Sequence, residues 1–172
     1  MGKAQKRIKD ALESISNRLP FPLKGIDPDN GGEFINWQLY NHCLANNIEF
    51  TRGRPYAKND NAHIEQKNYT HVRKLIGYKR LNQEHQLEKM NDLYRNEWDF
   101  YKNFFLPNKK LIEKRRIGAK IVKKYDDPKT PYQRLLEHKK LSESEKEKLR
   151  DIYAKLNPAE LKRNIDRKLS KI

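Results

Sequence analysis

Apolar residues recur at helical spacing near the start of the chain. Ile8, Leu12, Ile15 and Leu19 lie three or four positions apart, which places them on one face of an α-helix. Pro20 cannot continue a helix, because its ring fixes the backbone and removes a hydrogen-bond donor. The pattern therefore predicts an amphipathic helix that ends before Pro20.

A strand–turn–helix junction is predicted next. Residues 22–27 (PLKGID) and 47–51 (NIEFT) are typical of short strands, and the turn PDNGG follows the first of them. Between the two strands, a helix is predicted from the apolar spacing of Phe34, Trp37, Tyr40 and Leu44. Trp37, like Trp98 further on, is expected to belong to a helix core rather than to stack on bases.

Two longer helices are predicted after these strands. A loop over residues 52–60 leads into a helix that Asn59, Asp60 or Asn61 could cap and that Gly77 ends. A further helix is predicted over about residues 84–105, because Pro107 stops it.

The last third of the chain divides into a basic stretch and a helical tail. Residues 108–137 are basic and contain two prolines, so we expect an extended arm or a short β piece. Ser142 with Glu145 and Asn157 with Glu160 have the spacing of helix capping boxes, and Pro158 suits a first helical position. The tail is predicted to be a helical hairpin. The chain is expected to divide into an α/β part (1–106), a basic linker or arm (107–140) and the tail (141–172).

Charge points to a polyanionic partner. The 172 residues carry 38 Lys and Arg against 23 Asp and Glu, a net charge of +15. Residues 66–125 hold 16 basic and 6 acidic residues, so two thirds of the excess lies in one third of the chain. Such a concentration is typical of proteins that bind nucleic acid.

Cysteine content and hydropathy indicate the compartment. Cys43 is the single cysteine, which excludes a disulfide framework and a cysteine zinc site within the chain. No apolar run approaches the roughly 20 residues that a membrane span needs. The start also has no apolar signal segment. We therefore expect a soluble cytoplasmic protein with no membrane partner.

Three carboxylates, Asp27, Asp29 and Glu33, gather around two glycines in this basic chain. An EF-hand loop would need a carboxylate at its twelfth position, where Gln38 stands. A β-hairpin turn would need alternating apolar residues after it, whereas the spacing there is helical. The third interpretation places Asp29 just beyond a strand's carboxyl end, where α/β sheets bind ligands. A purely structural role for Asp29, capping the following helix, stays open.

Glu65 is the second carboxylate of interest. On an ideal helical wheel it falls between Val72 and Ile76, inside the apolar stripe of its helix. A carboxylate in such a position is costly unless it is paired or metal-bound. The alternative is an acid near a helix start, which the helix dipole favours. Between Asp29 and Glu65 lie 35 residues.

These residues resemble a known family. "DNGGEF", followed after 35 residues by a helical Glu, is similar to the second and third acids of the D,D-35-E integrase and transposase cores. More closely, "DNGGEFIN…TRGRPYAKNDNAHIEQKN…VRKLIGY" resembles bacterial insertion-sequence transposases with a retroviral-integrase-type catalytic domain. The matching stretch covers about residues 22–80, and "KYDDPKTPYQRLLE" and the tail resemble the family's C-terminal part.

The resemblance implies an α/β, RNase H-like fold and metal-dependent cleavage and strand transfer at DNA phosphodiesters. It makes Asp29 and Glu65 catalytic ligands of Mg²⁺ or Mn²⁺, for which oxygen donors are suited. The family's first Asp lies on a strand ahead of the opening helix, and no residue here matches it. The expectation is therefore a fold lacking its first three strands, followed by a helical tail, that is inactive alone.

Basic residues supply the expected DNA contacts. The basic residues of the loop before Glu65 and of the helix around it are expected to contact DNA, as is the polar Asn61. The basic residues of the arm are expected to contact phosphate groups. The full set is Arg52, Arg54, Lys58, Asn61, Lys67, Arg73, Lys109, Lys110, Arg115 and Arg116. Asn61 could instead cap its helix.

The expected partners are DNA and either another copy of this chain or an intact transposase. Two alternatives to a catalytic fragment remain: a noncatalytic basic DNA-binding protein, and a fragment that interferes with an intact transposase. Metal dependence separates the catalytic fragment from the noncatalytic DNA-binding protein.

Overall fold

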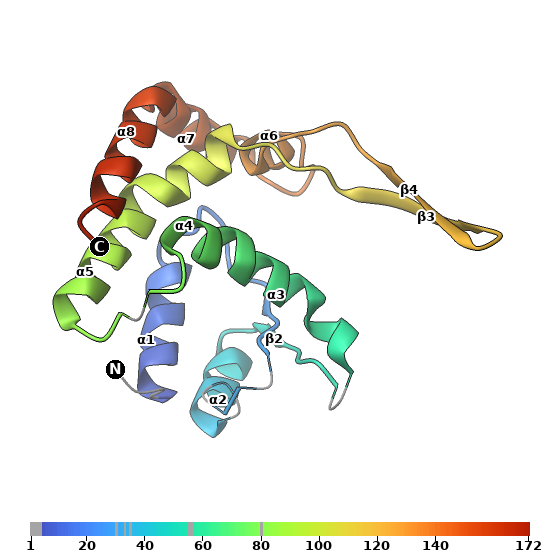
Figure 1. Cartoon of the computed structure of the whole chain (residues 1–172), viewed down its shortest axis with the longest axis horizontal. Coiled ribbons are helices and arrows are strands. Elements are labelled where there is room, and N and C mark those ends of the chain that lie inside the picture. Colours follow the sequence, from blue (N-terminus) through green and yellow to red (C-terminus); the bar gives the residue numbers. More distant parts are fainter. Residues whose placement is uncertain (1–4, 30, 33, 35, 55–56, 80) are drawn as a thin grey trace. The chain divides into compact units, whose positions relative to one another are not determined.

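The computed structural model describes the chain except at residues 1–4, 30, 33, 35, 55–56 and 80 (Figure 1). It is a mixed α/β structure with two small sheets in the described part. The chain divides into two units, Met1–Glu84 and His85–Ile172, which are described separately. No helix in the described part is long and apolar enough to cross a membrane.

The first unit builds a short parallel sheet between helices. Its elements are α1 (Gln5–Ser16), β1 (Gly25–Ile26), α2 (Trp37–Ala45), β2 (Glu49–Phe50), the 3₁₀ turn η1 (Lys58–Asn61), α3 (Ala62–Asn68), the π-helical turn η2 (Tyr69–Arg73) and α4 (Lys74–Ile76). Each predicted helix and strand is found, although both strands are shorter than the apolar runs suggested. Gly77, with a φ of 82°, ends the last helix as predicted.

Leu39, Cys43 and Ile48 form the buried core of the first unit. Ile8 and Leu12 of α1 pack against it, which confirms half of the predicted apolar face. The other half is wrong, because Ile15 is 43% exposed and Leu19 lies beyond the end of α1. The predicted stripe of α2 is wrong, because Trp37, Tyr40 and Leu44 are 77%, 45% and 66% exposed. Helix α2 buries the i, i+4 pair Leu39 and Cys43, so its aromatic side faces outward.

The second unit is mainly helical. Its elements are α5 (Glu84–Leu93), the π-helical turns η3 (Tyr94–Trp98) and η4 (Tyr101–Phe105), β3 (Leu111–Ile117), β4 (Lys120–Tyr125), α6 (Pro131–Leu136), α7 (Glu143–Ala154) and α8 (Pro158–Leu169). The helix predicted to end before Pro107 is found, with π-helical turns inside it. Helices α7 and α8 confirm the helical tail.

The core of the second unit is aromatic. Phe104, Tyr132 and Leu149 are buried together. The rings of Tyr132 and Tyr153 stack with centroids 4.8 Å apart, and those of Phe104 and Tyr132 lie 5.1 Å apart. The long helix, α6 and α7 are thereby joined in one cluster.

Helix ends in this unit follow the capping rules. Ser142 and Glu145 form the predicted capping box. Asn157 accepts hydrogen bonds from the backbone N–H groups of Ala159 and Glu160, so it caps α8. The second box is therefore only half present, since no return bond from the Glu160 side chain completes it.

Candidate DNA and metal site

Parallel pairing of β1 and β2 places two functional segments at one edge of the sheet. Gly25 pairs with Glu49 and Ile26 with Phe50. Because both strands point the same way, the segments that follow them leave from the same edge. The acidic turn follows β1, and the loop that leads to Glu65 follows β2. This is the edge at which α/β sheets bind ligands.

A side-chain contact joins the two segments at this edge. The Thr51 hydroxyl, just after β2, donates a hydrogen bond to Oδ1 of Asp27 at 3.0 Å. The backbone N–H of Thr51 also donates to the carbonyl of Ile26 at 3.1 Å. Asp27 therefore has a structural role, fastening the acidic turn to the loop, and its carboxylate is only partly available to another partner.

Asp29 is exposed and shapes the turn. Its Oδ1 accepts a hydrogen bond from the backbone N–H of Gly31 at 3.0 Å, so one of its two carboxylate oxygens is used within the turn. The cap of α2 is Asn36, whose side chain accepts from the N–H of Leu39 at 2.7 Å. The helix-capping alternative for Asp29 is therefore wrong. Glu33, the third acid of the stretch, lies outside the described residues.

Glu65 lies in α3 and is exposed. The expectation that it sits inside an apolar stripe with Val72 is wrong, because Val72 is itself 36% exposed. The wheel assumed regular α-helix throughout, whereas the π turn η2 separates Glu65 from Ile76. A π turn closes on i→i+5 hydrogen bonds, so it rotates the residues after it relative to those before it.

Asn61 occupies the capping position of α3 without acting as a cap. Its side chain makes no capping hydrogen bond. Its Oδ1 is buried and has no hydrogen-bond partner among the described residues. A Cβ on Gly53 would lie 2.6 Å from this oxygen, so the loop needs glycine there. The helix-cap alternative for Asn61 is wrong, and its contact with DNA or water stays a prediction.

The predicted metal ligands number two, Asp29 and Glu65. Among the described residues, no three His, Cys, Asp or Glu side chains are grouped as a metal site would group them. Asp29 and Glu65 each present carboxylate oxygens to solvent. Carboxylate oxygens are suitable ligands for Mg²⁺ or Mn²⁺. Two carboxylates do not fill the coordination shell of such an ion, so further oxygen ligands would be needed.

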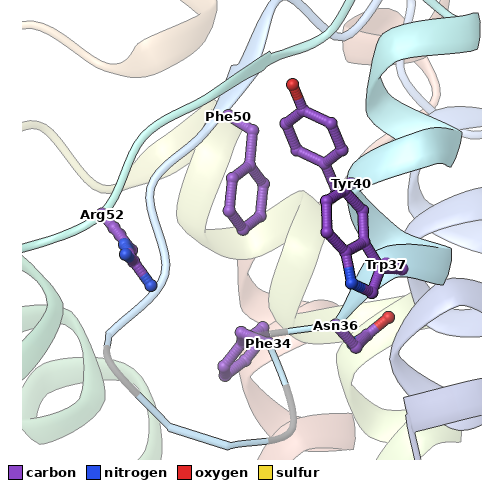
Figure 2. A pocket seen from close by; sticks show the side chains of 6 residues that line it. All are labelled: Phe34, Asn36, Trp37, Tyr40, Phe50 and Arg52. Atoms are coloured by element: carbon purple, nitrogen blue, oxygen red, sulfur yellow. The ribbon is translucent and has the colours of Figure 1, made fainter.

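An aromatic groove of about 500 Å³ opens beside the acidic turn (Figure 2). Its lining comes from the turn, from α2 and from the segment at the end of β2: Phe34, Asn36, Trp37, Tyr40, Phe50 and Arg52. Trp37 and Tyr40 meet edge to face with ring centroids 5.8 Å apart. Exposed rings beside a guanidinium can stack on a planar, electron-rich group.

The loop that carries Arg54 closes on an ion pair. Arg54 Nε lies 2.8 Å from Asp60 Oδ2, Nη2 lies 3.0 Å from Oδ1, and the backbone N–H of Arg54 donates to Oδ2 at 3.0 Å. These hydrogen bonds lower the pKa of Asp60 to about 2. Arg54 thus orders the loop, in addition to its predicted DNA contact. The side chain of Lys58 lies outside the described residues.

Basic residues after Glu65 are exposed. Lys67, Arg73 and Lys74 all face solvent. The Arg73 guanidinium lies 4.9 Å from the ring centre of Tyr78, and the Lys74 ammonium lies 5.3 Å from that of Tyr69. Cation–π contacts of this kind orient a charge without neutralising it.

The predicted basic arm is a two-stranded antiparallel ribbon, β3–β4, which projects beyond the helices of its unit (Figure 1). The predicted DNA-contacting residues Arg115 and Arg116 lie on β3, and Lys109 and Lys110 lie just before it. Gly118, with a φ of 59°, makes the connecting turn. Arg115 forms an ion pair with Glu113, and Arg116 donates to the carbonyl of Gly118 at 3.2 Å.

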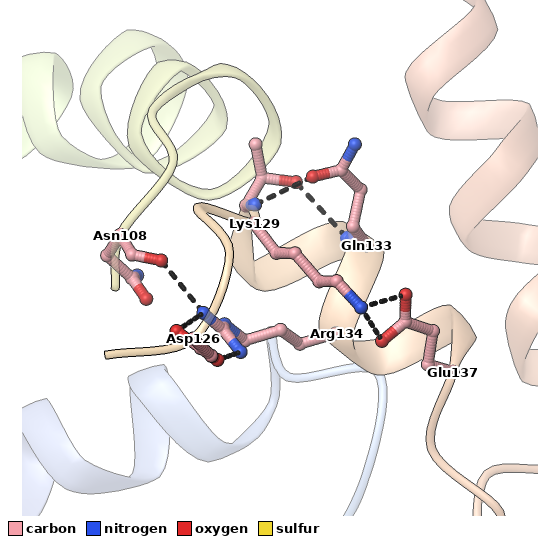
Figure 3. Close-up of polar contacts among 7 residues, drawn as sticks. Asn108, Asp126, Lys129, Gln133, Arg134 and Glu137 are labelled. Carbon is pink, nitrogen blue, oxygen red and sulfur yellow. Dashed lines mark hydrogen bonds and ion pairs between the residues drawn. The ribbon is translucent and has the colours of Figure 1, made fainter. Parts of the chain in front are cut away.

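The base of the ribbon is fastened to α6 (Figure 3). Asn108 and Lys129 exchange backbone hydrogen bonds at 3.0 and 3.2 Å. Asp126 accepts from the backbone N–H of Lys110 at 2.6 Å and forms an ion pair with Arg134. The network joins both strand ends to one helix.

Sequence reasoning missed helix α6. Thr130 and Gln133 form a complete capping box, and Pro131 stands at the first helical position. The spacing T-P-x-Q is a recognisable start signal. It could have been found inside the stretch assigned to the arm.

The chain is 43% identical over 124 residues to the uncharacterized protein y4rM of Sinorhizobium fredii (strain NBRC 101917 / NGR234). No family model matches the sequence. The similarity covers 72% of this chain and 35% of the relative, so the chain spans about a third of the length of that protein.

Proposed function

We propose that the chain carries the second and third acids of a bacterial insertion-sequence transposase core with an RNase H-like fold, and that it acts on DNA. The observation that supports this most directly is the parallel β1–β2 pair. It sends the Asp29 turn and the loop before Glu65 away from the same sheet edge. In α/β sheets this edge is where a catalytic constellation can be assembled.

Asp29 and Glu65 are the residues that would hold a divalent ion. Bound Mg²⁺ or Mn²⁺ would polarise the phosphodiester and favour attack by an oxygen nucleophile. In the described part of the chain no third carboxylate is grouped with them. The proposal therefore includes weak metal binding and no strand transfer by this chain alone.

Positioning of DNA falls to the basic residues. Arg52 lies on the wall of the aromatic groove, and the ribbon presents Lys and Arg to solvent. Phosphate contacts of this kind fix the position of a duplex without reading its sequence. A noncatalytic DNA-binding protein is the second candidate, and the exposed basic ribbon favours it.

Mn²⁺ titration separates the two candidates. The paramagnetic ion broadens NMR signals near its site, so the proposal predicts that signals of residues 29 and 65 broaden together. Asp29→Asn and Glu65→Gln should each abolish the broadening at both positions. Asp27→Asn is the matched control, since Asp27 is engaged by Thr51. Independent broadening at the two acids would contradict a shared metal site.

Plasmid nicking in Mn²⁺ tests the catalytic part. We expect DNA binding without nicking by the isolated chain. Nicking that Asp29→Asn and Glu65→Gln both abolish would show a working two-acid site and contradict the proposed inactivity. DNA binding without the shared Mn²⁺ site would support the noncatalytic candidate.

A further inference from the structure

The ribbon has two faces of different charge. Directly paired residues of an antiparallel ribbon project on the same face, and successive residues alternate. The pairs Lys114–Lys123 and Arg116–Ile121 therefore share one side, here named the basic face. The other side, the mixed face, carries Glu113, Arg115, Ile117, Lys120, Val122 and Lys124.

The basic face is assembled against an electrostatic cost. Lys114 and Lys123 are direct cross-strand partners, and like charges in that position destabilise a ribbon. In the described part of the chain neither lysine forms an ion pair, whereas on the mixed face Arg115 pairs with Glu113. An isolated two-stranded hairpin is itself only marginally stable. An arrangement that opposes folding in this way is expected where an anionic partner neutralises it.

The shape of the ribbon selects among anionic partners. A two-stranded β-ribbon fits the major groove of B-form DNA, which is about 12 Å wide. The deep, narrow major groove of double-stranded RNA does not admit it. Ile121, 55% exposed, lies opposite Arg116 and two positions before Lys123 on the same face, so it could contact thymine methyl groups at base edges.

We propose that the β3–β4 ribbon enters the major groove of duplex DNA with its basic face, Lys114, Arg116, Ile121 and Lys123, toward the DNA. This rests on the proposed function only for the choice of DNA as partner. It goes beyond that function in naming the element, the groove and the face, and it does not depend on the metal site.

Two matched double variants of the full chain test the face. Lys114→Gln/Lys123→Gln and Lys120→Gln/Lys124→Gln each remove two lysines from the same ribbon, one pair from each face. Fluorescence anisotropy with a duplex DNA probe measures Kd across salt concentrations. We expect the first variant to weaken binding about tenfold or more and to lower the salt slope by about 2, because each lost phosphate contact removes about 0.9. The second should weaken binding about threefold or less.

A stability readout separates lost contacts from a damaged ribbon. Relief of the Lys114–Lys123 repulsion should slow amide exchange in Leu111–Tyr125 of the first variant, although its DNA binding is weaker. Faster exchange there would mean that the binding loss came from unfolding, and the assignment of the face would fail.

The remaining outcomes are also decisive. Equal weakening by both variants would overturn the face while leaving the DNA partner of the proposed function in place. Double-stranded RNA bound as tightly as duplex DNA would overturn entry into the major groove. Failure of the unmodified chain to bind any duplex would remove the DNA partner itself, and both proposals with it.

Discussion

Arg134 holds Asp126 with two nitrogens of its guanidinium. Nη1 lies 2.6 Å from Oδ2 and Nη2 lies 3.2 Å from Oδ1, while Nη2 also donates to the carbonyl of Asn108 at 2.8 Å. Asn108 and Asp126 lie just outside the two ends of the ribbon. A single side chain of α6 therefore closes the base of the ribbon, and lysine could not reproduce this forked geometry.

Replacing Arg134 should loosen the ribbon without unfolding the unit. Arg134→Gln removes the ion pair and the contact with Asn108, so amide exchange across Leu111–Tyr125 should accelerate. Glu137→Gln is the control on the same helix, since it breaks only the exposed pair with Lys129. Unchanged exchange in the Arg134 variant would show that the backbone bridge between Asn108 and Lys129 is sufficient.

Acid should weaken the same closure. Hydrogen bonds from Arg134, and then from the backbone of Lys110, hold the pKa of Asp126 below its usual value. A depressed carboxyl pKa stabilises the folded form above the unfolded pKa, near 4, and this contribution is lost as pH falls through the folded pKa. Once the intrinsic pH dependence of amide exchange is divided out, the protection of the ribbon's amides should therefore fall below about pH 4. Asp126→Asn should remove this pH dependence.

The Arg54–Asp60 pair makes a second, numerical pH prediction. Asp60 titrates at about 2, lowered first by its hydrogen bond to the Arg54 side chain and then by that to the Arg54 backbone. The stabilisation of the loop by the Arg54–Asp60 ion pair is fully present above about pH 4 and is lost between about pH 4 and 2. Arg54→Gln should raise the Asp60 pKa only part of the way, because the backbone bond remains. A carboxyl titration followed by NMR checks this value.

Helix α2 offers a matched pair of leucines. Leu39 is fully buried and Leu44 is 66% exposed. Leu39→Ala should lower the free energy of unfolding of the first unit by about 2 to 5 kcal/mol. Leu44→Ala should change it by less than about 0.5 kcal/mol. Chemical denaturation measures both, and equal effects would contradict the orientation of α2.

Trp37 provides an optical test of the aromatic groove. Its ring is exposed, so a nucleobase stacked in the groove should quench its fluorescence. Trp98→Phe leaves Trp37 as the single tryptophan reporter. We expect quenching by single-stranded oligonucleotides, and a loss of affinity of about 1 kcal/mol or more in Trp37→Ala. Quenching that equals that of free tryptophan would argue against stacking.

Local rules predicted much of the helical structure. Ser142 and Glu145 are a capping box in the sequence and in the fold, and Gly77 ends its helix in both. Rules of this kind act within a few residues, so the rest of the fold does not alter them. Asn157 is a further example, because it caps α8 by accepting backbone hydrogen bonds although the Glu160 side chain does not bond back to it.

The buried face of a helix was harder to predict than the helix itself. The aromatic residues of α2 have core-like spacing, yet the buried side is set by Leu39 and Cys43, which the neighbouring α1 and sheet cover. After Glu65, the π turn η2 rotates the following residues around the helix axis relative to a regular α-helix. The residue types in this segment do not indicate a π turn. The ribbon does not show a clean apolar alternation, because both of its faces are exposed.

Of the candidate site, the sequence identified the acidic turn and the helix with Glu65, and the parallel sheet brings the segments leading to them to one edge. It could not assign Asn36 as the cap of α2 or Asp27 as the partner of Thr51. Those roles depend on contacts between residues far apart in the chain. The metal ligands and DNA contacts remain predictions.

The open edges of the ribbon also affect self-association of the chain. In the described part of the chain β3 and β4 bond only to each other, so each has one open edge that a strand of another copy could extend. The lysines and arginines along both strands repel such a copy. A polyanion that masks these charges would remove the barrier, so mixtures with substoichiometric DNA should be more prone to self-association than either the bare chain or the saturated complex.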